Sequence, residues 1–483
     1  MKSTSLHLYN TQSRSLKEFT CDGNTVRLYT CGPTVYDYLH IGNWAAYIFW
    51  DTLVRVLEGE GHQVERVLNI TDVGHLVSDG DEGEDKLEKG ARREGKTAWE
   101  VAEFYTEDFL ENAKKLGLIM PDHIARATDY IEEQLQLVRR LKAKGYTYQI
   151  TDGIYFDSTK FPRYGDFARL NIEELKAGAR VEFDPEKRSV SDFALWKFTP
   201  KEVDRDMEWD TPSDLLDSET SQRGFPGWHL ECSAIAMKHF GDTLDIHTGG
   251  IDHIPVHHTN EIAQSEAVTG KQFSRFWLHN NHMKVDGSKI SKSLGNGFML
   301  SDLEAKGFNP FDFRLLVLQS HYQSESNFTF ESLEAAKNRR HHWKNVACLR
   351  WQIKPGSEEN TVLTDTVLSE VTDLSSALLD NLNTPKALQI ADKLLSTIEN
   401  SFASDVTSGS IHVTVMETLD KLFGVDLVAS TPDINEKTKQ LLNSRQAARD
   451  TKDWELSDKL RSNLLALGVE VKDTASGSVW SYL

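Results

Sequence analysis

A strand, a long helix and a second strand follow one another near the N-terminus, and this order limits the possible folds more than any other feature of the sequence. Residues 26–30 are a short run of strand-forming residues, residues 40–58 form a long amphipathic stretch, and residues 64–70 are again apolar and β-branched. Such a βαβ unit places its two strands parallel in one sheet, with a right-handed crossover. The sequence therefore predicts an α/β protein built on a parallel sheet.

The length of the chain predicts further units beyond this sheet. Its 483 residues exceed the usual size of one domain, which is about 100 to 200 residues. Residues 158–225 are polar and irregular and look inserted between two halves of the sheet domain, because an apolar strand signal returns at 243–247. Residues 331–425 are rich in Leu, Ala, Lys and Glu and predict a helical bundle. The tail from about residue 435 predicts a small, separate α+β module.

Composition bears on the cellular setting and on the partners. The first ten residues lack the basic start and apolar run of a signal peptide, and no apolar stretch reaches about 18 residues, so a cytoplasmic protein without a membrane span is expected. The four cysteines are too few for a disulfide framework and are expected to be free thiols or metal ligands. A net charge of -20 argues against a broad nucleic-acid surface. The basic segment 337–344 is then either a local RNA contact or a solvated helix face.

Two motifs indicate phosphate chemistry. The segment CGPTVYDYLHIGN, residues 31–43, places His40 and Gly42 at the start of the predicted helix, where free N–H groups and the helix dipole favour phosphate. Gly42 lets a nucleotide approach closely, and His40 can donate to a phosphate oxygen. The second motif, KISKS at residues 289–293, lies between glycines and carries two lysines that can hold a triphosphate. Alone it is typical of a solvated basic loop, but the upstream motif favours a function in phosphate binding.

Four residues have the chemistry of a metal site. His257 and Glu261 are four residues apart, hence on one helical face, and Cys31 and Cys232 adjoin glycine-bounded motifs. Two thiolates, an imidazole and a carboxylate suit tetrahedral zinc. A His and a Glu at this spacing are also common as a surface pair, so spacing alone leaves both interpretations open.

Taken together, the motifs resemble those of a known enzyme family. HIGN is similar to the HIGH motif, and KISKS to the KMSKS motif, of class I aminoacyl-tRNA synthetases. The segments CGPTVYD, NITDVGH (69–75), GWHLECSA (227–234) and GGIDHIPVHHTNEIAQS (249–265) resemble the cysteinyl-tRNA synthetases within that class. The resemblance continues through residues 447–454 and so spans nearly the whole chain.

This resemblance implies a division of the chain into parts. The expected fold is a class I synthetase Rossmann-like catalytic domain with a parallel sheet, an inserted connective domain, a C-terminal helical bundle and a small α+β module. The implied ranges are a first catalytic half at 1–115, a connective insertion at 116–225, a second catalytic half at 226–265, a stem-contact region with the KISKS loop at 266–330, a helical bundle at 331–430 and an anticodon-binding module at 431–483.

The resemblance also implies roles for single residues. The phosphates would be stabilised by His40, Asn43, Lys289 and Lys292. The nucleotide would contact Gly42, Asp252 near the ribose, and Lys292. Cysteine would lie among Thr34, Thr71 and Trp228. One Zn2+ per chain would be held by Cys31, Cys232, His257 and Glu261. His258 would point about 100° around the helix from His257, so its position indicates either an outer partner of the ligands or a structural residue.

Substrates and partners follow from the same resemblance. They are ATP with Mg2+, L-cysteine and tRNA-Cys, for a cytoplasmic enzyme that is monomeric, as is common in the family. Three positions depart from the usual pattern, because Asn43 stands for His, Thr259 for Glu and Ile290 for Met. The Asn43 side chain can donate a hydrogen bond but cannot carry charge, which leaves its effect on rate open.

Two other functions compete with this interpretation. A cysteine ligase of the mycothiol-biosynthesis type would also make cysteinyl-adenylate but would pass cysteine to an amino sugar, and it would need no tRNA-reading module. A catalytically silent paralogue would bind zinc or RNA as a regulator. The long segment after the KISKS loop argues against the first, and the intact KISKS motif with all four ligands argues against the second.

Overall fold

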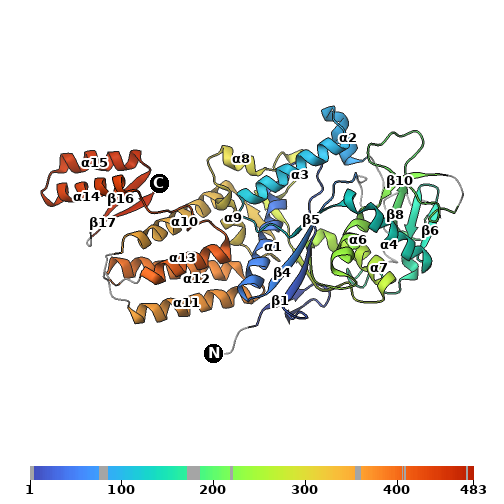
Figure 1. The fold of residues 1–483 in the computed structure, drawn as a ribbon, viewed down its shortest axis with the longest axis horizontal. Helices are drawn as coiled ribbons and strands as arrows, with labels where there is room; N and C mark the ends of the chain where they lie inside the picture. Colours follow the sequence, from blue (N-terminus) through green and yellow to red (C-terminus); the bar gives the residue numbers. More distant parts are fainter. Residues whose placement is uncertain are drawn as a thin grey trace.

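A computed structural model describes residues 5–74, 85–170, 185–217, 221–353, 360–404, 406, 409–474 and 477–483. Its centre is a five-stranded sheet of order β12-β11-β3-β4-β5, in which every neighbouring pair is parallel. The strands are β3 (Thr25–Thr30), β4 (Gln63–Ile70), β5 (His123–Arg126), β11 (Leu244–Gly250) and β12 (Ser274–Asn280). The predicted α/β fold with a parallel sheet is therefore confirmed (Figure 1).

Helix α1 (Ile41–Gly59) is the crossover of the predicted βαβ unit, and it runs from β3 to β4. Most of its residues are buried, including the large side chains of Trp44 and Trp50, because the helix packs between the sheet and the later helices. Its N-terminus therefore lies at the carboxyl end of β3, which is the edge of a parallel sheet where ligands usually bind. A short antiparallel hairpin, β1 (His7–Asn10) and β2 (Ser15–Glu18), precedes this unit.

Two helices lie between β4 and β5. Helix α2 (Lys86–Glu94) starts at Asp85, whose side chain accepts hydrogen bonds from the first turn, and helix α3 (Ala98–Lys115) starts at a capping box of Thr97 and Glu100. The ring of Phe109 on α3 stacks on Trp44 of α1, with centroids 5.3 Å apart. This contact fixes α3 beside the start of α1 (Figure 1).

The inserted part is an antiparallel sheet of order β6-β7-β8-β10-β9. Helix α4 (Ile131–Ala143) leads into it, and α6 (Trp228–Phe240) returns the chain to the main sheet. The described strands are β6 (Thr147–Ile150), β7 (Gly153–Phe156), β8 (Phe193–Phe198), β9 (Trp209–Asp210) and β10 (Arg223–Pro226). The interpretation of 158–225 as irregular was wrong for β8, whose six residues are all buried and pair with β7 and β10.

Two strands of the parallel sheet lie outside the ranges expected for the catalytic halves. Strand β5 falls within 116–225, and β12 falls within 266–330. Both pair with inner strands of the sheet, so the expected boundaries at 115 and 265 cut through it. The sequence pattern does not reveal these two strands as members of the sheet, because β5 is only four residues long and β12 follows a helix.

The C-terminal half is mainly helical. After α7 (Thr259–Thr269) and β12, a small sheet forms from β13 (Met283–Val285), β14 (Ser288–Lys289) and β15 (Ser326–Phe328). The helices that follow are α8 (Leu300–Ala305), α9 (Pro310–Leu318), α10 (Phe330–Cys348), α11 (Thr361–Leu379), α12 (Thr384–Ala403) and α13 (Gly409–Phe423). One continuous hydrophobic core joins α1 to α9 and to the later helices, so the bundle is firmly attached to the sheet domain.

The last segment has its own small core. Helices α14 (Glu436–Asp450) and α15 (Trp454–Ala466) pack beside a hairpin of β16 (Val469–Thr474) and β17 (Gly477–Tyr482). This unit lies at the end of the molecule opposite the inserted sheet (Figure 1). Among the described residues, no helix combines the length and apolar character that a membrane span requires.

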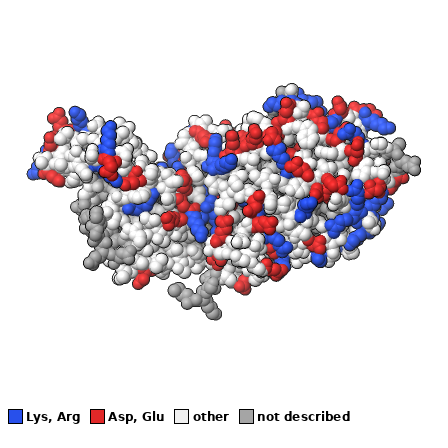
Figure 2. All heavy atoms as spheres, viewed as in Figure 1, with Lys and Arg blue, Asp and Glu red and all other residues white. Residues whose placement is uncertain are grey.

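Charged side chains of both signs are interspersed over the visible face of the molecule (Figure 2). The basic segment 337–344 on α10 is largely committed to contacts within the protein. Arg339 pairs with Asp392, and the Nε of Arg340 lies 2.7 Å from Oδ1 of Asp312. Trp343 is fully buried. These contacts favour the helix-face interpretation of this segment over an RNA contact.

Candidate active site

The four residues predicted as metal ligands meet at the carboxyl edge of the parallel sheet. Cys31 follows β3, Cys232 lies in α6, and Glu261 lies in the first turn of α7. His257 lies in η4 (Ile254–His258), a single π-helical turn that continues into α7. The ligand atoms of all four residues lie within 4.8 Å of one another, with Cys31 partly exposed and the others buried. Segments far apart in the sequence thus build one cluster.

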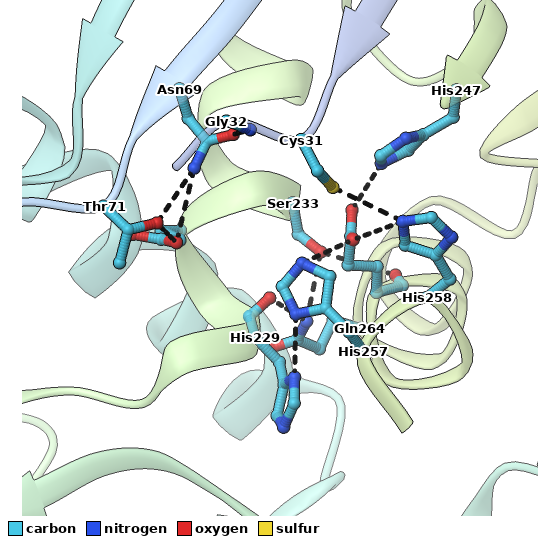
Figure 3. A network of polar contacts seen from close by, with 12 residues as sticks. Cys31, Gly32, Asn69, Thr71, His229, Ser233, His247, His257, His258 and Gln264 are labelled. Atoms are coloured by element: carbon cyan, nitrogen blue, oxygen red, sulfur yellow. Dashed lines mark hydrogen bonds and ion pairs between the residues drawn. The ribbon is translucent and has the colours of Figure 1, made fainter. Parts of the chain in front are cut away.

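Each side chain in this cluster has close polar neighbours. His257 Nε2 lies 3.1 Å from Glu261 Oε1, and its other ring nitrogen lies 3.0 Å from Nδ1 of His229. Cys31 Sγ lies 3.4 Å from Nε2 of His258. Figure 3 shows Cys31 and His247 pointing from the sheet toward the histidines of the helix. The spacing of four residues between His257 and Glu261 therefore gives direct contact, although η4 is wound more widely than an α-helix.

A second ligand set overlaps the first, and the sequence did not reveal it. Cys31, His247, His258 and Glu261 also bring one ligand atom each within 4.8 Å of one another. His247 Nε2 lies 2.9 Å from Glu261 Oε2, and both side chains are fully buried. His247 is on β11 and not in a quoted motif, so only the order of the strands could place it here. Because the two sets share Cys31 and Glu261, they describe one site with alternative ligands.

The electrostatics of the cluster favour ionised ligands. Burial raises the pKa of Glu261, but the charges of His247 and His257 outweigh it and lower the pKa to about 2. Burial also raises the pKa of Cys31, while a hydrogen bond from Cys232 and nearby His258 bring it well below the ordinary value. Burial keeps the pKa of Cys232 well above its ordinary value. The carboxylate and one thiolate are thus stabilised by positive charge on the neighbouring imidazoles, a role that a bound cation could also fill.

A divalent metal fits this donor set. The ring nitrogens of His257 and His258 lie 3.1 and 3.8 Å from the buried Oε1 of Glu261, which makes no hydrogen bond of good geometry with any described residue. The donors thus face one another as the ligands of a bound cation would. Thiolate, imidazole and carboxylate together are typical zinc donors. The carboxylate is further oriented through its other oxygen by His247, which is the kind of outer contact that metal ligands usually have.

The predicted pocket residues lie around the cluster. The ring of Trp228 lies 4.7 Å from that of His257, centroid to centroid. Thr34 and Thr71 face each other in an isolated parallel bridge between the ends of β3 and β4. The hydroxyl of Thr71 donates to Glu231 and accepts from Asn69, so it acts as both donor and acceptor in the local network. His75, at the end of this motif, lies outside the described residues.

Gly32 is required by the close packing of this pocket. Its backbone N–H donates to the Oδ1 of Asn69 at 2.8 Å. A Cβ at this position would lie 1.5 Å from the carbonyl oxygen of Asn69, so no other residue fits. The glycine after Cys31 therefore lets the loop that follows β3 approach the end of β4.

The structure brings the HIGN and KISKS motifs into contact. His40 is the N-cap of α1, with its Nδ1 accepting from the Asn43 backbone N–H at 3.2 Å, and Oδ1 of Asn43 accepting in return from the His40 N–H. A Cβ on Gly42 would lie 2.8 Å from Cδ1 of Ile290, so the KISKS loop packs directly against the start of α1. Asn43 thus has a capping role that the motif comparison did not indicate.

The remaining predicted residues lie at the same edge. Lys289 is exposed at the end of β14, and the Lys292 side chain lies outside the described part of the structure. Asp252 is exposed in η3 (Ile251–His253), just after β11. Next to it, His253 was not predicted as a site residue. Its Nδ1 is buried without a hydrogen bond to any described residue, and its ring lies 6.3 Å from that of Trp228.

Comparison with known proteins finds relatives along nearly the whole chain. Residues 18–338 match the family described as tRNA synthetases class I (C) catalytic domain, and residues 431–480 match the cysteinyl-tRNA ligase anticodon binding domain. The chain is 42% identical over 477 residues to cysteine–tRNA ligase 1 of Burkholderia lata, covering 98% of this chain and 96% of the relative. It is 38% identical over 503 residues to the cysteine–tRNA ligase of Treponema denticola, covering 99% and 100%.

Solved structures agree at the level of the fold. The chain is similar to Mycobacterium tuberculosis methionyl-tRNA synthetase in complex with methionyl-adenylate, with a TM-score of 0.60 and 16% sequence identity. The similarity covers 84% of this chain and 92% of the other. At this identity the likeness supports the class I fold and nothing finer.

Proposed function

The chain belongs to the cysteinyl-tRNA synthetases of class I and is a cysteine–tRNA ligase, and from this premise we propose which residues select cysteine and which activate it. The ligase uses ATP and cysteine and acts on tRNA. We propose tRNA-Cys as the specific acceptor, the cytoplasm as the location and a monomer as the working form. The matched anticodon-binding domain at 431–480 argues against a small amine as the acceptor.

We propose that a single zinc ion is held by Cys31, Cys232, His257 and Glu261. This set supplies both thiols of the cluster, and soft sulfur donors suit zinc better than the second imidazole of the overlapping set. When bound, zinc would offer a coordination position for the thiolate of the substrate, which serine oxygen or an alanine methyl group matches poorly. His247 and His258 would then orient Glu261 and Cys31 from outside.

The chain's own residues supply the rest of amino acid selection. Trp228 would close one side of the cysteine pocket with its ring, and Thr34 and Thr71 would line the opposite side. The buried network of Asn69, Thr71 and Glu231 holds this wall in one position. A rigid pocket wall lowers the entropy lost when cysteine binds.

Activation is proposed to take place at the contact between α1 and the KISKS loop. The cysteine carboxylate attacks the α-phosphorus of ATP, and cysteinyl-adenylate and pyrophosphate form. His40 would donate to the phosphates, and the positive end of the α1 dipole would favour them. Lys289 with Lys292 would neutralise the leaving pyrophosphate together with the Mg2+ that accompanies ATP. Asp252 would accept hydrogen bonds from the ribose hydroxyls.

In the second step the terminal ribose hydroxyl of the tRNA attacks the acyl carbon of the adenylate. AMP leaves, and an ester of cysteine with the tRNA forms. No covalent bond to the enzyme is needed. Asn43 would support this step indirectly, because it fixes the orientation of His40 through the capping box.

One observation carries this assignment of residues: four side chains from three separate segments of the chain converge on one cluster at the carboxyl edge of the parallel sheet. The test is aminoacylation of tRNA-Cys with labelled cysteine, run beside cysteine-dependent pyrophosphate exchange. Both activities are expected, with serine giving no detectable exchange. Exchange without charging would instead indicate a small amine acceptor, and the loss of both would indicate a silent zinc protein.

A further inference from the structure

A group of aromatic rings lies exposed near the active site without a role in the steps above. Tyr38 and Phe104 are each 41% exposed, and both pack against the buried Tyr105, at centroid distances of 5.0 and 5.1 Å. The rings of Tyr38 and Phe104 are 6.0 Å apart. The Nζ of Lys96 lies 4.9 Å above the ring of Phe104. We call Tyr38, Phe104 and Lys96 the aromatic–cationic patch.

This patch is continuous with the phosphate-binding end of the active site. Tyr38 precedes the N-cap His40 by two residues in the loop that follows β3. Helix α2 rests on the same loop, because a Cβ on Gly90 would lie 3.7 Å from the carbonyl oxygen of Tyr36. Exposed cations continue from the patch along α2, at Lys89, Arg92 and Arg93.

Exposed rings beside cations have the chemistry that single-stranded nucleic acid requires. Unpaired bases stack on aromatic side chains regardless of sequence, and nearby Lys and Arg attract the phosphates. The second step of the reaction needs the single-stranded 3' end of the tRNA at the acyl carbon beside His40. We propose that the aromatic–cationic patch binds this unpaired 3' end as it enters the active site, an inference that rests on the proposed function.

The surroundings of the patch set the path of the strand. Along α3 the exposed carboxylates of Glu100 and Glu107 lie one helical turn to either side of Phe104 and would repel phosphate. The strand therefore crosses α3 at Phe104 and passes Lys96, which lies between the two helices, toward α2, instead of following α3. In the view of Figure 1, α2 and α3 lie along the same long edge of the molecule as α8 and the C-terminal module, so one tRNA can reach both.

The first experiment separates tRNA charging from cysteine activation. Phe104→Leu keeps an apolar side chain but removes the stacking surface, and Phe104→Tyr restores a ring. Loss of one stacked base contact is expected to lower kcat/KM for tRNA charging about 5- to 100-fold in the Leu variant. Pyrophosphate exchange should stay within about twofold of the wild type, and the Tyr variant should recover most of the charging activity.

A matched control lies on the same helix. Trp99 is 46% exposed, but its indole N–H donates to the carbonyl of Asp206 at 3.1 Å, away from the patch. Trp99→Leu is therefore expected to charge tRNA like the wild type. If Phe104→Leu charges tRNA as well as the wild type does, and both proteins carry out pyrophosphate exchange, the inference is overturned and the proposed function stands. Absence of both activities from the wild type would overturn the proposed function instead.

The second experiment locates the contact on the tRNA. Binding is measured for full-length tRNA and for tRNA that lacks the unpaired 3'-terminal nucleotides. Removing these nucleotides should weaken binding to the wild type by several-fold and binding to Phe104→Leu by a clearly smaller factor, because the stacking contact of Phe104 is already lost in that variant. The same loss in both proteins would show that Phe104 does not contact the 3' end and would refute the inference.

Discussion

Replacing His247 tests which residues bind the metal directly and which only orient its ligands. His247→Leu keeps similar volume beside Trp277, on which the imidazole stacks at 4.6 Å, but removes the donor that lies 2.9 Å from Oε2 of Glu261. The carboxylate oxygen then stays buried without this partner, which costs about 1 to 3 kcal/mol. Zinc affinity should fall about 10- to 100-fold, the usual effect of losing an outer contact.

The comparison with Cys232→Ala makes this result decisive. If Cys232 is a ligand, as proposed, the alanine variant should not retain one zinc per chain through dialysis, whereas His247→Leu should retain it at micromolar free metal. His247→Gln is the matched control, because its amide can donate to the same oxygen and should restore most of the zinc affinity.

Competition with a chromophoric chelator measures the zinc affinity of all three variants, and thermal unfolding checks that each variant is folded. Loss of zinc from His247→Leu together with full retention by Cys232→Ala would refute the proposed ligand set and favour the set with His247 and His258.

Three further predictions concern activation and stability. Lys289→Ala should lower kcat for pyrophosphate exchange about 100- to 1000-fold, because one donor to the transition state is lost, and zinc content should not change. Gly42→Ala should lower exchange at least about tenfold, since its Cβ would meet Ile290 at 2.8 Å and displace the KISKS loop from α1; unchanged exchange would contradict this contact. Asp51→Asn should lower the free energy of unfolding by about 3 kcal/mol at pH 7, because it leaves the fully buried Arg314 without a charged partner. Burial raises the pKa of Asp51, but the two arginines outweigh it and lower this pKa below its ordinary value. The stabilisation by the Asp51 carboxylate is therefore fully present above about pH 4 and is lost as the pH falls through the lowered pKa. In urea unfolding, the difference in free energy of unfolding between wild type and variant should shrink below that pH, because the wild type then takes up the proton.

The parts of the site that depend on local geometry could be predicted from the sequence. His257 and Glu261 at a spacing of four residues do contact each other, and His40 with Gly42 does open a helix after a strand. In both cases the relevant residues lie within one or two turns of the same element. The helical periodicity of the sequence was therefore enough to predict these local contacts. The residues from distant segments, such as Cys31 and Cys232, were assigned to the site through the family resemblance.

The parts that depend on strand order could not be predicted. His247 and His279 lie on β11 and β12, and they reach the cluster only because these strands are neighbours in the sheet. His279 Nε2 lies 2.7 Å from Nδ1 of His258, a contact between residues with no common spacing rule. The expected boundary at residue 265 was wrong for the same reason. Strand β12 follows α7 in the chain, and its own residues do not indicate that it pairs with β11 in the parallel sheet.

The buried metal cluster and the exposed KISKS end of the candidate active site differ in their exposure to water. We expect this difference to give them different effects on the kinetics. Glu261 and His247 are fully buried, so their interactions are strong and rigid before any substrate arrives. Lys289 and Asp252 are exposed, so water weakens their interactions in the absence of the nucleotide that we propose as their ligand. Changes in the buried cluster should therefore alter KM for cysteine and its discrimination from serine, whereas changes in the KISKS loop should act on kcat. The packing of Ile290 against Gly42 couples the KISKS loop to the start of α1, so a shift of the loop should also move the His40 end of this helix.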